Sequence, residues 1–144
     1  MRRIHIATAI AVAAFAFTGA AANAEAMKFK AALDGASETP PNDSKGTGMM
    51  TATFDPATGM LTWSIDYSGL TGPAVAAHFH GPAPAGKAAG VEVPLAAPLD
   101  SPIKGSAKLT PEQAKDLTSG QMYVNIHTAE HKPGEIRGQV EPAM

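Results

Sequence analysis

Apolar and polar residues alternate along several short stretches of the chain, which is the pattern of β-strands with one buried face. The clearest stretch spans residues 48–70, where two alternating arms flank the turn sequence DPATG at residues 55–59. In the second arm, LTWSIDY, apolar side chains take every second position and hydroxyl or carboxylate side chains take the others. The pattern predicts a β-hairpin whose apolar face, including the single tryptophan Trp63, packs in the core.

Further strands are predicted wherever a short alternating or apolar run lies between turn residues. They span residues 27–33, 76–80, 91–95, 103–109, 121–128 and 135–141. One short helix is predicted near residues 111–118, because Thr110 can cap it, Pro111 takes its first position and Gly120 can end it. The 14 Gly and 12 Pro residues supply many turns. Together these features indicate an all-β fold, an antiparallel Greek-key β-sandwich or barrel with that one short helix.

The first 24 residues differ in character from the rest of the chain. Arg2 and Arg3 precede an apolar run over residues 4–17, and small residues follow as far as Ala24. This is the pattern of a secretory signal peptide, and the run is short for a transmembrane helix, although a retained membrane anchor is the alternative. We therefore expect cleavage after Ala24, a single mature domain over residues 25–144, and a periplasmic or secreted location.

The charge balance narrows the classes of partner. Removal of the predicted signal peptide leaves 9 basic residues against 13 acidic ones, a net charge of −4. A mildly acidic chain without basic clusters argues against nucleic acid as a partner, and we expect no membrane association after cleavage. The chain contains no cysteine, so disulfides, thiolate metal sites and cysteine nucleophiles are excluded. The sequence leaves the oligomeric state open.

Four histidines of the predicted mature chain form two close pairs, His78 with His80 and His127 with His131. Residues two apart on a strand point to the same face, so His78 and His80 can approach one ion together. His127 lies at the end of another predicted strand, and His131 follows in a loop bent by a Pro-Gly pair. The pairs predict a metal site built from these four imidazoles, and the alternative is that they are separate surface side chains.

The donor atoms indicate which metal such a site would hold. Imidazole nitrogens suit copper or zinc better than calcium or magnesium, which prefer oxygen ligands. We predict one copper ion, with zinc as the alternative. Four methionines within or beside predicted strands offer thioether ligands for Cu(I) or, as their positions favour, core packing; they are Met49, Met50, Met60 and Met122.

Arg137 is the candidate catalytic residue outside the histidines. It lies on the last predicted strand and shares a face with Glu135 by the two-residue period. Two interpretations stand side by side. The arginine forms a cross-strand ion pair, or it is a fixed cation near the metal that steers a small anion towards it.

Three segments of the chain, HFHGPAPAG, LTPEQAKDLTSG and YVNIHTAEHKPGEIRGQV, closely resemble the CHRD (chordin-type) domain family in its bacterial exported form. The resemblance covers most of residues 27–141. A second resemblance, in the order of an HxH strand, a later strand-end histidine and an arginine, is to the copper half of the copper/zinc superoxide dismutases, which are Greek-key β-sandwiches. It implies that His78, His80 and His127 are copper ligands. It also implies that His131 is an additional or substitute ligand and that Arg137 guides superoxide.

The chain has no counterpart of the zinc-binding loop or the disulfide of those dismutases, so the second resemblance points to a centre with copper alone. The leading hypothesis is an exported copper-binding CHRD domain protein acting as a superoxide dismutase-like oxidoreductase, in which Arg137 attracts the superoxide anion. One alternative is a non-catalytic periplasmic copper carrier or buffer. Another is an extracellular interaction module without metal.

Overall fold

The computed structural model describes residues 24–144, so the predicted signal peptide, apart from Ala24, lies outside the described residues. The elements are β1 (Met27–Asp34), β2 (Thr47–Asp55), β3 (Met60–Ser68), β4 (Ala74–His80), β5 (Val91–Pro94), β6 (Ile103–Lys108), α1 (Pro111–Thr118), β7 (Tyr123–Thr128), β8 (Ile136–Gln139) and β9 (Glu141–Pro142). Every predicted strand is present, with ends that differ by one or two residues. The predicted strand over residues 135–141 divides into β8 and the short β9.

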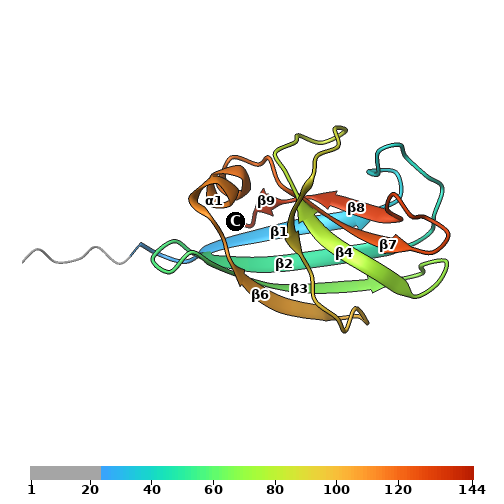
Figure 1. Ribbon diagram of the computed structural model, residues 1–144, viewed down its shortest axis with the longest axis horizontal. Helices are drawn as coiled ribbons and strands as arrows, with labels where there is room; N and C mark the ends of the chain where they lie inside the picture. Colours follow the sequence, from blue (N-terminus) through green and yellow to red (C-terminus); the bar gives the residue numbers. More distant parts are fainter. Residues whose placement is uncertain (1–23) are drawn as a thin grey trace, which may run out of the picture.

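The strands pair antiparallel in the order β5-β4-β7-β8-β1-β2-β3-β6, with β9 beside β1. They fold into two facing layers, one of β5, β4, β7 and β8 and the other of β1, β2, β3 and β6 (Figure 1). The layers join where β8 meets β1 through a single residue pair, Arg137 with Asp34. The predicted all-β antiparallel sandwich is confirmed, in a nearly closed form.

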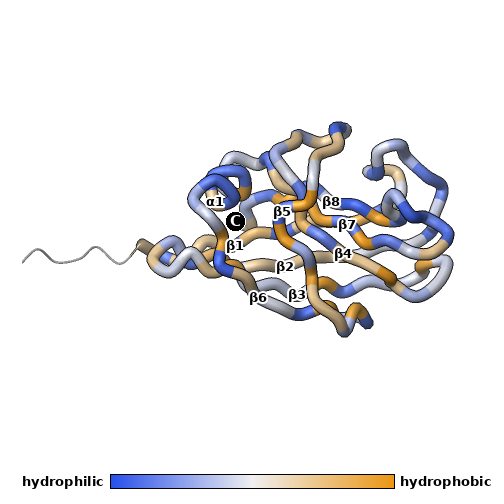
Figure 2. Tube along the Cα trace, viewed as in Figure 1, coloured by the Kyte–Doolittle hydropathy of each residue, from blue (hydrophilic) through white to orange (hydrophobic). Residues whose placement is uncertain are grey.

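The core fills the space between the two layers with the apolar side chains of alternating positions. Along β3, Leu61, Trp63 and Ile65 are buried, as the hairpin pattern predicted. The Trp63 ring meets Phe79 of β4 edge to face, with ring centroids 5.3 Å apart. Such a pair contributes about 0.5–1.5 kcal/mol beyond the burial of its area. Hydrophobic and hydrophilic positions alternate along the strands in Figure 2, and Trp63 is confirmed as a core residue.

The methionines divide between core and surface. Met50 and Met122 are fully buried, Met60 is partly buried, and Met49 is 47 % exposed. The core prediction is therefore right for Met50 and Met122 and wrong for Met49. The reason is the two-residue period, because Met49 and Met50 are neighbours on β2 and must point to opposite faces.

The helix α1 is confirmed with the predicted bounds and cap. The Thr110 hydroxyl accepts a hydrogen bond from the Gln113 backbone N–H, and the Gln113 side chain accepts one from the Thr110 N–H at 2.9 Å. The Gln113 amide also donates to the Glu92 carbonyl at 2.8 Å, which ties the helix to β5. Leu117 is fully buried beneath it. Within residues 24–144, no helix is long and apolar enough to cross a membrane.

The outer face of β4, β7 and β8 brings together polar side chains from three strands. The pairing register aligns His78 with Asn125, and Asn125 with Arg137, across the three strands. The next row aligns His80 with Tyr123. Because alternate residues on each strand face inward, the sheet presents these side chains together on one surface.

Candidate metal centre

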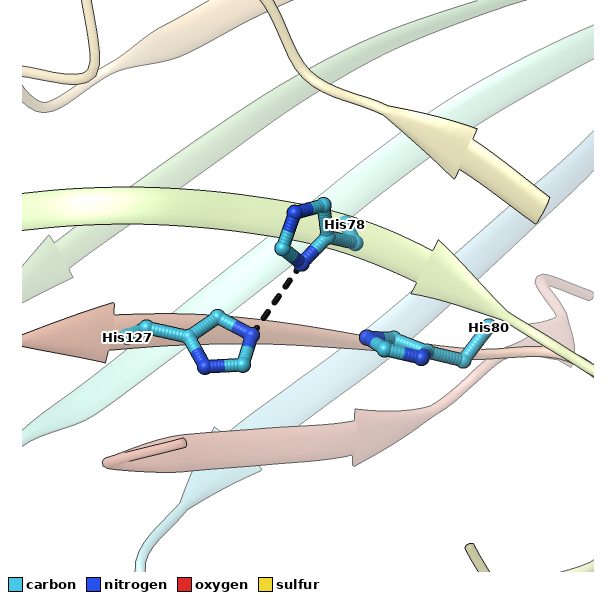
Figure 3. Close-up of side chains that lie close together, drawn as sticks. All are labelled: His78, His80 and His127. Carbon is cyan, nitrogen blue, oxygen red and sulfur yellow. Dashed lines mark hydrogen bonds between the residues drawn. The ribbon is translucent and has the colours of Figure 1, made fainter. Parts of the chain in front are cut away.

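Three of the four predicted histidines come together on this outer face. His78 and His80 leave the same side of β4, and His127 approaches from the neighbouring β7 (Figure 3). One ligand atom from each of the three lies within 4.8 Å of the other two. The shortest approach is 3.1 Å, between Nδ1 of His78 and Nε2 of His127. The three side chains can therefore hold one metal ion. The shared face of His78 and His80 agrees with the prediction made from their spacing.

Backbone carbonyl groups set the orientation of two of the imidazole rings. Nδ1 of His80 lies 3.0 Å from the Ala89 carbonyl oxygen, and Nδ1 of His127 lies 2.8 Å from the Lys132 carbonyl oxygen. A carbonyl oxygen only accepts, so each Nδ1 donates a proton and a neutral ring keeps its lone pair on Nε2. In His80 this Nε2 faces the acceptor Oδ1 of Asn125, so that contact is a hydrogen bond only when the ring is protonated. A metal-binding histidine is commonly fixed in this way through its second nitrogen.

The surroundings favour the neutral form of His78 and His80. Burial lowers the pKa of His78, and the neighbouring His127 and His80 lower it further. Burial also lowers the pKa of His80, and it outweighs the opposing effect of the hydrogen bonds to Ala89 and Asn125. The Asn125 side chain lies 3.0 Å from Nε2 of His80. Neutral nitrogens with free lone pairs are the form that a metal ion requires.

The His80 ring is supported by a stack with the Tyr123 ring and the Arg137 guanidinium. Its ring lies parallel to the Tyr123 ring, with centroids 4.8 Å apart and an interplanar angle of 3°. The Arg137 guanidinium carbon lies 3.5 Å from the centre of the same Tyr123 ring. His80 comes from β4 and Arg137 from β8, the two strands that flank β7, so they cover opposite faces of the tyrosine. The Tyr123 hydroxyl donates to the Ala89 carbonyl at 3.2 Å and accepts from the Ala89 N–H at 3.1 Å.

Hydrogen bonds also fasten the loop of residues 81–90 beside the site. Arg137 donates to the Pro84 carbonyl at 3.3 Å, and Gln139 donates to the Ala83 carbonyl at 2.8 Å. Together with the two contacts of the Tyr123 hydroxyl, these bonds hold both ends of the loop. The loop therefore presents the Ala89 carbonyl to His80 from a fixed position.

Arg137, the predicted catalytic cation, is only 1 % exposed. Its guanidinium donates to Thr39 Oγ1 at 2.9 Å and lies beneath Tyr123, on the side away from His80. Glu135 has other partners, since its carboxylate accepts hydrogen bonds from Ser44, Thr71 and Thr128 at 2.6–2.9 Å. Arg137 and Glu135 therefore have separate hydrogen-bond partners. Arg137 contacts the Tyr123 ring, on which the His80 ring stacks.

His131 lies outside the group of three within residues 24–144. It follows β7 in the connecting loop, where its backbone N–H donates to Thr128 Oγ1 at 3.2 Å. Its charge acts instead on Glu38, a carboxyl that is 5 % exposed. Burial raises the pKa of Glu38 to about 7, although the Asn125 side chain and the charges of Arg137 and His131 oppose the shift.

Sequence reasoning assigned no role to Tyr123, Asn125 or Glu38. The available signal is the alternation along residues 121–128, in which Tyr123 and Asn125 share a face with His127. Glu38 lies in a polar loop distant in sequence from the histidines, and no local pattern marks it. Its position depends on how this loop folds against β7 and β8.

Comparison with known families identifies the domain. The CHRD domain matches residues 29–140, which span β1 to the end of the core. The chain belongs to the CHRD domain family. This confirms the first resemblance, which was drawn from the segments HFHGPAPAG, LTPEQAKDLTSG and YVNIHTAEHKPGEIRGQV, and a CHRD domain fits an extracellular module. No curated protein and no solved structure matches the chain significantly.

Proposed function

We propose that this CHRD protein is exported and binds one copper ion through His78, His80 and His127. The observation that carries the proposal is the convergence of three ring nitrogens, each within 4.8 Å of the others, in a cluster in which backbone carbonyls orient two of the three rings. Binding requires Nε2 of His80 to exchange its Asn125 neighbour for the ion. The remaining contacts of the His80 ring can stay as they are.

The donor set favours copper among the available metals. Three imidazole nitrogens suit copper and zinc, and at a given nitrogen site Cu²⁺ binds more tightly than Zn²⁺. Export supports the same choice, because an exported protein meets copper away from cytosolic thiols. The predicted signal peptide and the extracellular character of CHRD domains both favour that location.

Superoxide dismutation is the second candidate function. Three protein ligands leave a position for a small molecule, which distinguishes catalytic from closed structural sites. Bound copper supplies a one-electron couple, with which two superoxide anions and two protons become one O₂ and one H₂O₂. In this proposal Arg137 acts through Tyr123 on the orientation of His80, and its buried charge adds to the positive potential felt by an approaching anion. A copper carrier or buffer would use the same three ligands without turnover.

Copper titration of the purified protein, followed by calorimetry and electron paramagnetic resonance, tests the binding site. We expect one Cu²⁺ per chain with nitrogen hyperfine structure, and loss of that binding in the His78→Ala/His80→Ala double variant. The matched control is His131→Ala, which removes an imidazole outside the cluster and should keep one copper per chain. Unchanged copper binding by the double variant would overturn the proposed site.

Superoxide consumption by the copper-loaded protein separates the enzyme from the carrier. A rate far above that of the metal-free protein, and a slower rate in Arg137→Ala at equal copper loading, is the result expected of a dismutase. Background rates in both proteins, with copper tightly bound, would identify a carrier or buffer. Failure of the wild-type protein to take up any copper would leave the interaction module as the function.

A further inference from the structure

A second candidate site lies on the opposite layer, away from the histidines. The outer face of β1, β2, β3 and β6 forms a trough with a volume of about 820 Å³, within the range of roughly 300–1,000 Å³ that is usual for ligand sites. Its polar lining combines lysines with serine and threonine hydroxyls. We call it the lysine trough, after Lys28, Lys30 and Lys104.

The strand register explains how the lysines come to flank the trough. Across the four strands one row of outward side chains consists of Lys30, Thr51, Ser64 and Lys104. The neighbouring row begins with Lys28 and continues with three hydroxyl side chains. With strands about 4.8 Å apart, the backbone positions of Lys30 and Lys104 are roughly 14 Å apart. The lysines therefore stand at both sides of a floor of small hydroxyl residues.

The charge of the trough lining is opposite to that of the protein as a whole. Without the predicted signal peptide the chain carries 13 acidic and 9 basic residues, yet no residue that lines the trough is acidic. The nearest acidic positions by register are Glu141 on β9, opposite Lys30, Asp66 on β3, one row beyond Ser64, and Asp55 on β2, one row beyond Thr53. All three lie outside the lining. All three lysines are exposed, so the trough offers positive charge to an anionic ligand.

We propose that the lysine trough binds a carboxylated polysaccharide, that is, a polyuronate chain. A single compact anion would have to draw the lysines of both sides inward over the floor, whereas carboxylates repeated along a chain can meet them at both sides of the trough. Sugar hydroxyls match the threonine and serine hydroxyls of the floor, which both donate and accept hydrogen bonds. The threonine methyl groups and the lysine alkyl stems offer apolar contacts to the faces of sugar rings.

Calorimetric titration with a polygalacturonate oligomer tests the proposal, with neutral amylose oligomers as the comparison ligand. We expect binding of polygalacturonate alone, weakened by added salt. The Lys30→Gln/Lys104→Gln variant should bind about tenfold more weakly, the loss expected for two exposed charge contacts. The control Lys87→Gln/Lys115→Gln changes the net charge equally, removes two exposed lysines outside the trough, and should bind as the wild type does.

Several results would overturn the polysaccharide site. They are equal weakening in both double variants, equal binding of amylose and polygalacturonate, and an absence of polygalacturonate binding by the wild type. Binding to vesicles of anionic phospholipid without binding to polygalacturonate would likewise reject it in favour of a lipid surface. The site shares no residue with the proposed copper ligands, so these outcomes are independent of copper binding.

Discussion

The Tyr123→Phe substitution isolates the role of one hydroxyl in preparing the histidine cluster. It keeps the ring that stacks between His80 and Arg137, and removes hydrogen bonds of 3.1 and 3.2 Å to Ala89. Each such bond contributes about 0.5–1.5 kcal/mol net, so we expect the free energy of unfolding to fall by about 1–2 kcal/mol. Because Ala89 also accepts the proton of His80 Nδ1, copper affinity should fall about tenfold, the lower end of effects seen for partners of metal ligands.

The matched control is Tyr67→Phe, which deletes the other tyrosine hydroxyl of the chain. That hydroxyl donates to the Leu99 carbonyl at 2.6 Å and has no contact with the histidines. Its loss should lower the unfolding free energy by about 1 kcal/mol and leave copper affinity unchanged. Urea denaturation of the metal-free proteins and competitive copper titration measure the two quantities. If both variants lose similar stability and Tyr123→Phe keeps wild-type copper affinity, the reasoning about the Ala89 carbonyl is wrong.

Three further predictions concern pH and buried groups. Because His78 and His80 have lowered pKa values, the metal-free protein should lose stability as pH falls below the ordinary histidine pKa of about 6.5, which urea titrations at several pH values can check. Copper should be released over the same acid range, which copper retention at those pH values can check. Burial opposes ionisation of Glu135, but its hydrogen bonds prevail and lower its pKa; stability should therefore decrease as pH falls below about 4.5, and Glu135→Gln should flatten that part of the pH profile. Gly134→Ala should destabilise the fold by about 2–3 kcal/mol in chemical denaturation, because φ is +132° and the added Cβ would overlap the Glu38 carboxyl.

Local patterns were sufficient to predict most of the secondary structure. The strands follow from a period of two residues, and α1 follows from a capping sequence around Thr110 and Gln113. Met49 shows the limit of such reasoning. Its type and its place within a strand both favoured the core, but adjacent strand residues face opposite sides, and Met50 takes the buried one.

Part of the candidate site follows from residue spacing along one strand, and part follows from the pairing of strands that are distant in sequence. His78 and His80 share a face because of their spacing, which is a property of the local chain. His127 joins them only because β7 pairs with β4 in the observed register, and His131 lies outside the group because the chain leaves the strand after Thr128. Strand pairing depends on segments distant in sequence, so the spacing of residues along the chain does not predict it.

What the sequence by itself determined is therefore the list of strands, the CHRD family, and the presence of imidazole donors on polar strand faces. The tertiary structure decided which donors meet, which nitrogen of His80 and His127 keeps its lone pair, and why Arg137 is buried beneath Tyr123. The physical reason is that these properties depend on backbone carbonyls and on burial. Every residue has a carbonyl group, so only the folded chain shows which carbonyl a given imidazole meets. Burial likewise depends on segments far apart in the sequence.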